Sequence, residues 1–372
     1  MTAPIAFIDL KAQRTRLGVR IDAAVARVLD HCQFVMGPEV VELEKQLGAF
    51  GGAKHVLSCA NGTDALALPL MAWGVGRGDA VFVPSFTFAA TAEVVPWFEA
   101  EPVFVDVLPD TYNMDPASLE AAIVAVKAEG RLTPRVVIAV DLFGQPADYP
   151  KIAEITRRHG MKLISDSAQG FGCTLNGEQP LEWADVTTTS FFPAKPLGCY
   201  GDGGAVLTND DSLIDVLRSL RNHGAGTDKY DNVRIGMNSR LDTIQAAILL
   251  EKLAVFPQEI GLRNQAADRY AEGLAGSVGV PSVIAGGTCV WAQYTIESDE
   301  RDALAARLRE AGVPTAAYYP RPLHMQTAYY SYPRAPGGLP VTEAKAPRVL
   351  SLPMHSDLDP ATQERIVSAV RS

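Results

Sequence analysis

The segment that decides the fold is Thr187-Thr-Thr-Ser-Phe-Phe-Pro-Ala-Lys-Pro-Leu-Gly-Cys-Tyr-Gly-Asp-Gly-Gly204. Strand-forming residues fill 187–192, and the run breaks at Pro193. Lys195 follows between two prolines, and a glycine-rich turn leads to a second strand-like run at 205–208. Lysine forms Schiff bases once its charge is suppressed, and a lysine between prolines has little freedom to swing. Taken alone, the segment fits either a catalytic lysine or a solvent-facing lysine on a hairpin.

A carboxylate upstream is placed to meet this lysine. Leu163 and Ile164 indicate the end of a buried strand, and Asp166 stands at its carboxyl edge. The stretch between Asp166 and Lys195 is long enough for one connection and one further strand. We therefore expect both side chains at the ends of neighbouring strands. In an open α/β sheet, ligands bind at that edge. Pyridoxal phosphate needs this pair, because a lysine bonds to its aldehyde carbon and a carboxylate keeps its pyridine nitrogen protonated.

The first two thirds of the chain alternate between strand and helix patterns. Short apolar or β-branched runs predict strands at 80–83, 103–106, 136–140, 163–164 and 187–190. Helical patterns occupy 91–98, 116–129, 149–158 and 213–221, and two earlier helices are expected at 21–29 and 40–50. This rhythm predicts an α/β fold with a large, doubly wound, mainly parallel sheet.

The chain length predicts two domains. With 372 residues, of which 47% are hydrophobic, the chain is too long for one compact core of typical size. We place the boundary near Val255-Phe-Pro257, which divides a large cofactor-binding domain (1–255) from a small α+β domain (256–372). In the small domain the patterns predict helices at 260–274, 301–311 and 360–370, strands at 290–296 and 315–319, and a loop at 320–340.

Composition and charge exclude several classes of function. The net charge of −10 argues against nonspecific binding to nucleic acids or membrane surfaces, which needs basic patches. The five cysteines are scattered without a Cys-x-x-Cys pair, so we expect no metal site, no disulfide framework and a cytoplasmic location. The first residues lack a signal-peptide pattern, and the longest apolar run, 65–73, is too short to span a membrane.

Six short blocks carry a resemblance to one family. They are Ala60–Leu66, Pro84–Thr91, Asp166–Gln169, Ser190–Lys195, Gly201–Gly204 and Gly236–Arg240. With these blocks in this order, the chain resembles the DegT/DnrJ/StrS family of nucleotide-sugar aminotransferases from Phe7 to His355. The resemblance implies a pyridoxal-phosphate-dependent transferase of fold type I, the aspartate aminotransferase fold, that serves surface-polysaccharide or O-antigen biosynthesis.

Local patterns assign two of the cofactor contacts. Small polar residues at 61–64 indicate a helix start, and free N–H groups at a helix start bind anions. Gly62 and Thr63 are therefore assigned to the cofactor phosphate, with an ordinary helix cap as the alternative. Phe88 would stack on the pyridine ring, with Phe86 as its rival and a place in the core as the alternative.

The resemblance implies the remaining roles. Lys195 and Asp166 are the catalytic residues: Lys195 holds the cofactor and moves the proton, and Asp166 faces the ring nitrogen. Gln169 would contact the ring hydroxyl, and Ser190 the phosphate. Asn238 would reach the phosphate in the partner subunit, which implies a homodimer with shared active sites. The implied amino donor is glutamate, which leaves as 2-oxoglutarate.

The substrate is inferred from the same resemblance. The block around Lys195 looks most like members that aminate UDP-2-acetamido-3-keto-glucuronic acid. Arg240 would bind an anionic part of the sugar nucleotide, with a salt bridge as the alternative. Tyr318, Tyr319 and His324 would face the sugar or serve packing. That subgroup carries His where Tyr318 stands and Asn where His324 stands, so a dTDP-linked 3- or 4-keto-6-deoxysugar stays open as the substrate.

Two other classes of protein make different demands on the sequence. A nicotinamide-dependent sugar dehydratase or epimerase needs a G-x-G-x-x-G turn and a Tyr-x-x-x-Lys pair. The stretch Gly74–Asp79 lacks the final glycine, which argues against this class. A non-catalytic regulator with the same fold would not need Lys195, Asp166 and Gln169 together, so their presence favours the enzyme.

Overall fold

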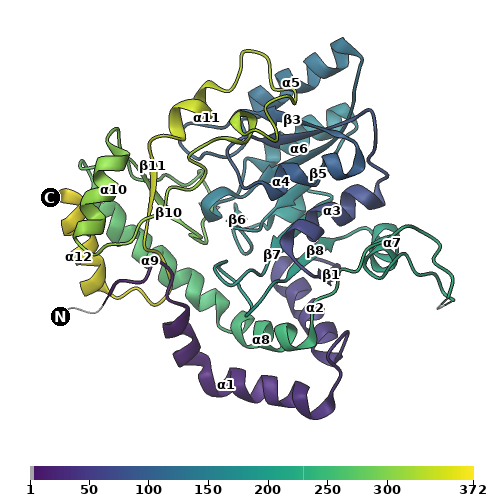
Figure 1. Cartoon of the computed structure of the whole chain (residues 1–372), viewed down its shortest axis with the longest axis horizontal. Coiled ribbons are helices and arrows are strands. Elements are labelled where there is room, and N and C mark those ends of the chain that lie inside the picture. Colours follow the sequence, from purple (N-terminus) through teal and green to yellow (C-terminus); the bar gives the residue numbers. More distant parts are fainter. Residues whose placement is uncertain (1–3, 229) are drawn as a thin grey trace.

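A seven-stranded sheet lies at the centre of the computed structural model, which describes residues 4–228 and 230–372 (Figure 1). The strand order is β1-β8-β7-β5-β4-β2-β3. The strands are β1 His55–Cys59, β2 Asp79–Pro84, β3 Glu101–Val105, β4 Thr133–Val140, β5 Lys162–Asp166, β7 Val186–Ser190 and β8 Gly204–Thr208. All pairs from β3 to β7 are parallel, and β8 runs antiparallel to both β7 and β1. The predicted mainly parallel sheet is confirmed.

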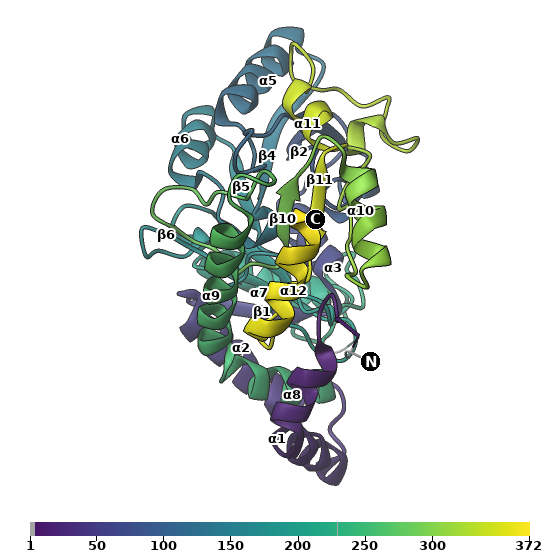
Figure 2. The same cartoon turned by 90° about the vertical axis from the view of Figure 1, so that its left-hand side faces the viewer.

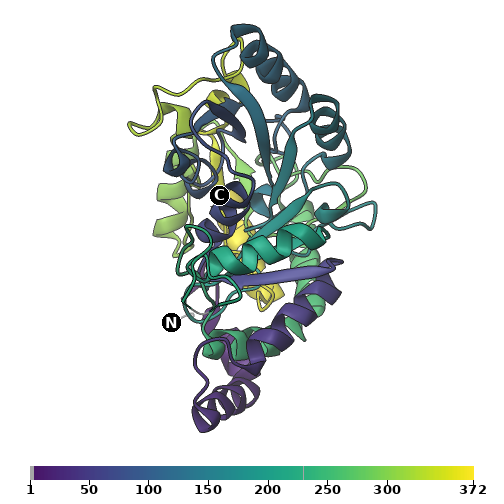
Figure 3. The same ribbon diagram turned by 90° about the vertical axis from the view of Figure 1, so that its right-hand side faces the viewer.

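Helices cover both faces of this sheet. They are α2 Pro38–Gly51, α3 Gly62–Ala72, α4 Ala90–Glu93, α5 Pro116–Glu129, α6 Tyr149–His159, α7 Asp211–Arg221 and α8 Thr243–Leu253. Helix α1 Leu10–His31 packs on the outer side of α8. Along β8, Val206 packs against α3 and α7, whereas Leu207 packs against α2 and α8, because successive strand residues point to opposite faces. Figure 1 shows α1 and α8 below the sheet and α5 at its upper end, and in Figure 3 the teal helix α7 runs along the violet strand β1.

Local signals set the ends of the helices. Helix α5 begins after Asp115, whose side chain accepts a hydrogen bond from the N–H of Ala117. It ends at Gly130, which takes a left-handed conformation with φ 72° that glycine adopts without strain. The predicted range 116–129 is therefore confirmed.

The C-terminal part forms a smaller layer of helices on a short sheet. Helices α9 Phe256–Leu274, α10 Arg301–Glu310 and α12 Pro360–Arg371 surround the antiparallel strands β10 Tyr294–Glu297 and β11 Val349–Leu352 (Figure 2). A second short antiparallel pair joins β9 Gly287–Thr288 of this part to β6 Thr174–Leu175, which lies between β5 and β7 in the chain. Leu323 and Tyr329 pack into the core of the large sheet. The division at 255/256 stays a prediction.

Several predicted elements differ in the structure. The range 91–98 holds only the single turn α4 and a 3-10 turn at Pro96–Phe98, because Pro96 cannot continue an α-helix. The strand predicted at 315–319 is wrong: Ala316 forms an isolated bridge to Ser351, and Tyr319 takes φ 59°, which ends an extended run. The strand at 290–296 is limited to β10, since Trp291 has φ 49°. A short helix, α11 Pro340–Lys345, falls at the end of the predicted loop.

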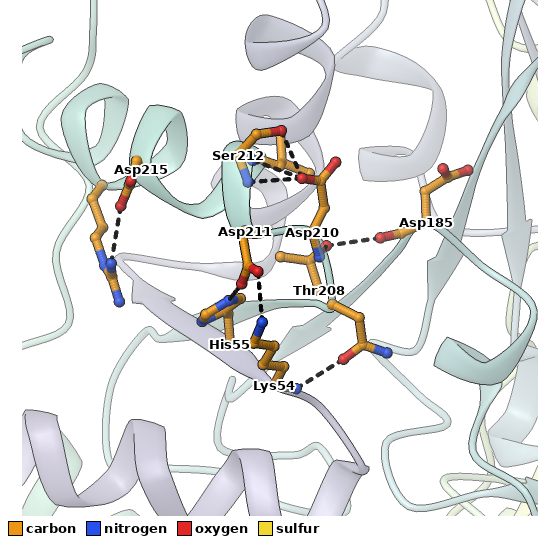
Figure 4. Close-up of polar contacts among 11 residues, drawn as sticks. Lys54, His55, Asp185, Thr208, Asp210, Asp211, Ser212 and Asp215 are labelled. Atoms are coloured by element: carbon orange, nitrogen blue, oxygen red, sulfur yellow. Dashed lines mark hydrogen bonds and ion pairs between the residues drawn. The ribbon is translucent and has the colours of Figure 1, made fainter.

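A cluster of polar contacts lies just after Thr208, the end of β8 that is farther from Lys195 (Figure 4). Asp210 caps α7 by accepting hydrogen bonds from the N–H groups of Ser212 and Leu213 at 2.8 and 3.1 Å. Asp211 accepts from Lys54 Nζ at 2.6 Å and contacts His55 Nε2 at 2.5 Å. These contacts tie α7 to the start of β1, which pairs with β8 from His55 opposite Thr208 to Cys59 opposite Gly204. Within the described residues, no helix has the length and apolar character to cross a membrane.

Candidate active site

Lys195 and Asp166 meet at one edge of the sheet. Strand β5 ends at Asp166, which pairs with Thr188 of the neighbouring strand β7. Lys195 follows β7 in a turn that is closed by a 2.8 Å hydrogen bond from its own N–H to the carbonyl of Phe192. The charges of Lys195 and Asp166 act on each other's pKa. The prediction that both residues leave neighbouring strands is confirmed.

Two opposing effects act on the pKa of the Lys195 amine. The side chain keeps partial access to solvent, but the protein around its amine lowers the pKa by burial, an effect that the charge of Asp166 opposes. Burial raises the pKa of Asp166, whereas hydrogen bonds from Thr91 Oγ1 at 2.8 Å and from the N–H of Ala168 at 3.2 Å lower it, as does the charge of Lys195. The neutral amine is the nucleophilic form of lysine, and a lowered pKa brings that form closer to neutral pH, which suits attack on a carbonyl carbon.

The start of α3 and the end of β7 form a cradle. Asn61 caps α3 by accepting a 2.8 Å hydrogen bond from the N–H of Asp64. By position, the N–H groups of Gly62 and Thr63 have no carbonyl partner inside the helix, which makes this end an anion site. A Cβ atom added at Gly62 would lie 2.6 Å from Cβ of Ser190. The structure thus brings Gly62, Thr63 and Ser190 together, and their contact with a phosphate stays a prediction.

Gln169 is fixed at both ends of its amide. Its Oε1 accepts from the N–H of Phe143 at 2.8 Å, and its Nε2 donates to the hydroxyl of Tyr319 at 2.7 Å. Tyr319 was predicted as a sugar contact, and the structure joins it directly to a predicted cofactor residue. Both residues therefore belong to one side of the site.

The two candidate aromatic rings have opposite environments. Phe86 is 0% exposed and packs against Tyr112, Phe143 and Tyr319. Phe88 is 57% exposed, and its carbonyl accepts from the N–H of Thr91, the residue that holds Asp166. Phe88 is therefore the ring available to a ligand, and Phe86 takes the core role.

His324 is held by protein groups. Its Nδ1 lies 2.6 Å from Ser85 Oγ, and its Nε2 lies 3.1 Å from Glu343 Oε1. Because the side chain is buried with both ring nitrogens engaged, this geometry favours the packing alternative over a sugar contact. Tyr318 packs near Phe7, with 6.3 Å between the ring centroids.

Asn238 and Arg240 lie on the segment between α7 and α8. Both residues precede helix α8, which begins at Thr243 after the cap residue Asp242. Asn238 is exposed and forms an isolated β-bridge with Asn222. Arg240 Nη1 donates to Asn222 Oδ1 at 3.3 Å, which is a hydrogen bond rather than the alternative salt bridge.

Sequence patterns missed two residues that lie next to Asp166, Thr91 and Asp141. Thr91 lies in a quoted block, but nothing local indicates that its hydroxyl reaches a residue on another strand. Asp141 follows β4, the other neighbour of β5, and is buried behind Asp166. A lone aspartate after a buried strand was the only signal for it.

The residues fit pyridoxal phosphate. The structure holds a lysine of lowered pKa beside a hydrogen-bonded carboxylate, as the aldehyde and the ring nitrogen require. At the cradle, only a glycine at position 62 leaves room beside Ser190, and the helix start supplies N–H donors for a phosphate.

Comparisons with known proteins agree with this site. The sequence profile of the DegT/DnrJ/EryC1/StrS aminotransferase family matches residues 16–371. UDP-2-acetamido-2-deoxy-3-oxo-D-glucuronate aminotransferase of Pseudomonas aeruginosa is 48% identical over 369 residues, which cover 98% of this chain and 99% of that protein. The crystal structure of a DegT DnrJ EryC1 StrS aminotransferase from Brucella abortus has a TM-score of 0.97 and 55% identity, covering 99% of this chain and 98% of that one. NtdA from Bacillus subtilis, solved with bound cofactor PMP, has a TM-score of 0.88 and 28% identity, covering 100% and 85%.

Proposed function

Because this chain belongs to the DegT/DnrJ/EryC1/StrS aminotransferase family, we propose that it transfers the amino group of L-glutamate to the keto group of UDP-2-acetamido-2-deoxy-3-oxo-D-glucuronate or a close relative. The observation that carries the proposal is the meeting of a lysine of lowered pKa with a buried carboxylate at the ends of neighbouring strands. The sugar is supported by the 48% identity to the Pseudomonas aeruginosa enzyme over nearly the full length of both chains.

The enzyme uses pyridoxal phosphate, which supplies an aldehyde for a lysine amine and a ring that withdraws electrons from the adjacent carbon. Lys195 would bind the aldehyde carbon, and Asp166 would keep the ring nitrogen protonated. Ser190 and the start of α3 would hold the phosphate from one subunit, together with Asn238 of the partner subunit. Gln169 would position the ring hydroxyl, and Phe88 would cover the ring face.

One amine serves both halves of the reaction. In the first half, the amino group of glutamate would replace Lys195 at the aldehyde carbon, and the freed Nζ would take the proton from Cα of glutamate. Water would then supply the keto oxygen of 2-oxoglutarate, which leaves without the amino group. In the second half, the same amine would return a proton to the sugar carbon that receives the amino group. Because the first product leaves before the sugar binds, the kinetics should be ping-pong.

The homodimer and the cytoplasmic location belong to the same proposal. Apolar side chains stay exposed on α1, α2 and the loop before α8, with Val19 at 86%, Val41 at 64% and Ile235 at 88% exposure. We place the subunit interface of the proposed homodimer on these elements, because contact with a partner would bury these exposed side chains. All five cysteines are free, which supports a reducing compartment.

The test uses the purified enzyme loaded with pyridoxal phosphate. Adding glutamate should bleach the yellow absorbance, and the UDP-linked 3-keto uronate should restore it while the aminated sugar forms. A dTDP-linked keto-6-deoxysugar, offered in parallel, should restore it much more slowly. The reverse preference would replace the proposed sugar with the dTDP-linked one. A protein that stays colourless after cofactor is added would favour the non-catalytic regulator.

A further inference from the structure

A second buried carboxylate lies directly behind Asp166. Asp141 is 0% exposed and follows β4, the strand beside β5. Its backbone N–H donates a 3.0 Å hydrogen bond to the carbonyl of Asp166, so the two residues are joined where their strands end. The reaction steps described above assign no role to Asp141.

The carboxylate of Asp141 holds the residues on both sides of Asp166. Ser167 Oγ donates to its Oδ2, and Ser165 Oγ lies 3.3 Å from the same atom. Side chains alternate along a strand, so Ser165 and Ser167 point away from the face that Asp166 uses. Asp141 therefore fixes the strand end from behind, while Thr91 holds the Asp166 carboxylate itself.

The remaining contacts of Asp141 are with neutral groups. Its Oδ1 accepts from the hydroxyl of Tyr149 at 2.7 Å and from the N–H of Ala147 at 3.2 Å. The thiol of Cys173 lies beside the carboxylate, and burial raises the pKa values of Tyr149 and Cys173, so both stay uncharged. Burial also raises the pKa of the Cys289 thiol, to which the charge of Asp141 adds a smaller effect, so that thiol stays protonated as well.

The chain packs closely against Asp141 at Gly170. A Cβ atom added at Gly170 would lie 2.2 Å from Cβ of Asp141 and 3.0 Å from its Oδ2. Gly170 comes directly after the Asp166–Gln169 block. The absence of a side chain at Gly170 therefore lets the backbone after Gln169 pack directly against Asp141.

We infer that Asp141 is a positioning residue for Asp166, which holds the strand end in place and adds a second negative charge behind the protonated ring nitrogen of the cofactor. The inference rests on the proposed role of Asp166. It adds a named residue whose charge acts through another carboxylate rather than by touching the cofactor.

The charge of Asp141 makes a prediction about pH. Burial raises its pKa to about 6, and repulsion from Asp166 adds to that rise. When a positively charged ring nitrogen pairs with Asp166, this repulsion is relieved, so the pKa of Asp141 falls on cofactor binding. The cofactor-free protein then holds the proton more tightly, and affinity for pyridoxal phosphate should decrease as the pH falls through about 6.

The experiment is a titration of the cofactor-free protein with pyridoxal phosphate, followed by absorbance between about pH 5.5 and 8, a window set by the linkage. Asp141→Asn keeps the size and most hydrogen bonds but removes the charge. Its dissociation constant should rise roughly three- to tenfold at neutral pH, and its acid-side weakening should be smaller than in the wild type. The control is Asp185→Asn. Asp185 pairs with Lys162 at the start of β5, away from Asp166, so this variant should bind pyridoxal phosphate like the wild type.

Further variants separate position from charge. Ser167→Ala leaves the charge of Asp141 but removes one contact, and it should weaken cofactor binding with the acid-side dependence kept. If Asp141→Asn does not fold, Ser167→Ala alone decides, and unchanged cofactor binding in that variant overturns the inference. Equal dissociation constants for Asp141→Asn and the wild type at every pH would also overturn it.

The readout needs neither sugar nor amino donor, so an error in the proposed substrate does not affect it. Asp166→Asn serves as the check on the underlying assignment. If that variant binds pyridoxal phosphate with the wild-type spectrum and affinity, the role of Asp166 is wrong, and the result is distinct from a failure at Asp141.

Discussion

Thr91 Oγ1 donates a 2.8 Å hydrogen bond to Asp166 Oδ2, although the two residues follow strands that are not neighbours. Thr91 lies in α4 after β2, Asp166 ends β5, and β4 runs between those two strands. The bond crosses the carboxyl edge of the sheet and lowers the pKa of a carboxyl that burial raises. The ionised form of Asp166 therefore depends on a residue contributed by a different βα unit.

Replacing Thr91 by valine should make the enzyme more sensitive to acid. Thr91→Val keeps the shape but removes the hydroxyl, so the pKa of Asp166 rises and the acid limb of the kcat/KM profile moves to higher pH. A loss of about 1–3 kcal/mol is expected in cofactor binding or transition-state stabilisation. Thr91→Ser, which keeps the hydroxyl, is the matched control. An acid limb that does not move in the valine variant would contradict the role of this bond.

Replacing Lys195 by alanine should abolish turnover. The variant lacks the amine that binds the cofactor aldehyde and moves the proton, so kcat should fall by roughly a thousandfold or more. Formation of 2-oxoglutarate from glutamate measures the effect. Lys162→Ala removes an exposed lysine that pairs with Asp185 at 2.6 Å, and it should keep near-normal activity. Appreciable turnover in Lys195→Ala would remove the basis of the assignment.

Alanine at Gly62 should disrupt the phosphate cradle. Its methyl group would lie 2.6 Å from Cβ of Ser190, so the start of α3 or the end of β7 has to shift. Affinity for pyridoxal phosphate should fall about tenfold or more, since several phosphate contacts move together. Gly261→Ala is the control, because a Cβ atom there meets nothing within 4 Å and lies inside α9. That variant should be neutral or stabilised by up to about 1 kcal/mol.

Lys252 contacts the turn that follows Lys195, and its buried amine should make the stability of the protein depend on pH. Its Nζ donates to the carbonyl of Gly198 at 2.7 Å and lies 4.3 Å from the centre of the Tyr200 ring. Burial lowers its pKa from 10.5 to about 8, so the unfolded chain holds the proton more tightly than the folded one. The stability contributed by this group is fully present above about pH 10.5 and is lost as the pH falls toward 8.

The matching measurement compares the wild type with Lys252→Met by chemical denaturation between pH 8 and 10.5, the window given by the two pKa values. The free energy of unfolding of the wild type, relative to the variant, should increase across this window by on the order of 3 kcal/mol. A difference that stays constant would show that Lys252 titrates alike in both states.

Much of the fold followed from short-range patterns. The apolar and β-branched runs before Asp166 and Lys195 predicted β5 and β7, and the helical pattern at 116–129 predicted α5 with its observed bounds. Errors fell where single residues adopt uncommon backbone conformations. Tyr319, with φ 59°, ends the strand predicted at 315–319, and nothing in its neighbours signals that angle.

For the site, the candidates at Gly62, Asp166 and Lys195 follow from helix starts and strand ends, which are visible in the local sequence, whereas Ser190 was assigned by the family resemblance. The partners that set their chemistry do not follow from such local patterns. Thr91 and Asp141 reach the strand end of Asp166 from two other strands, and Phe88 differs from Phe86 only in which side of the turn faces solvent. Such contacts arise when segments far apart in the chain pack together, so they are decided by the folded arrangement and leave no periodic trace in the residues themselves.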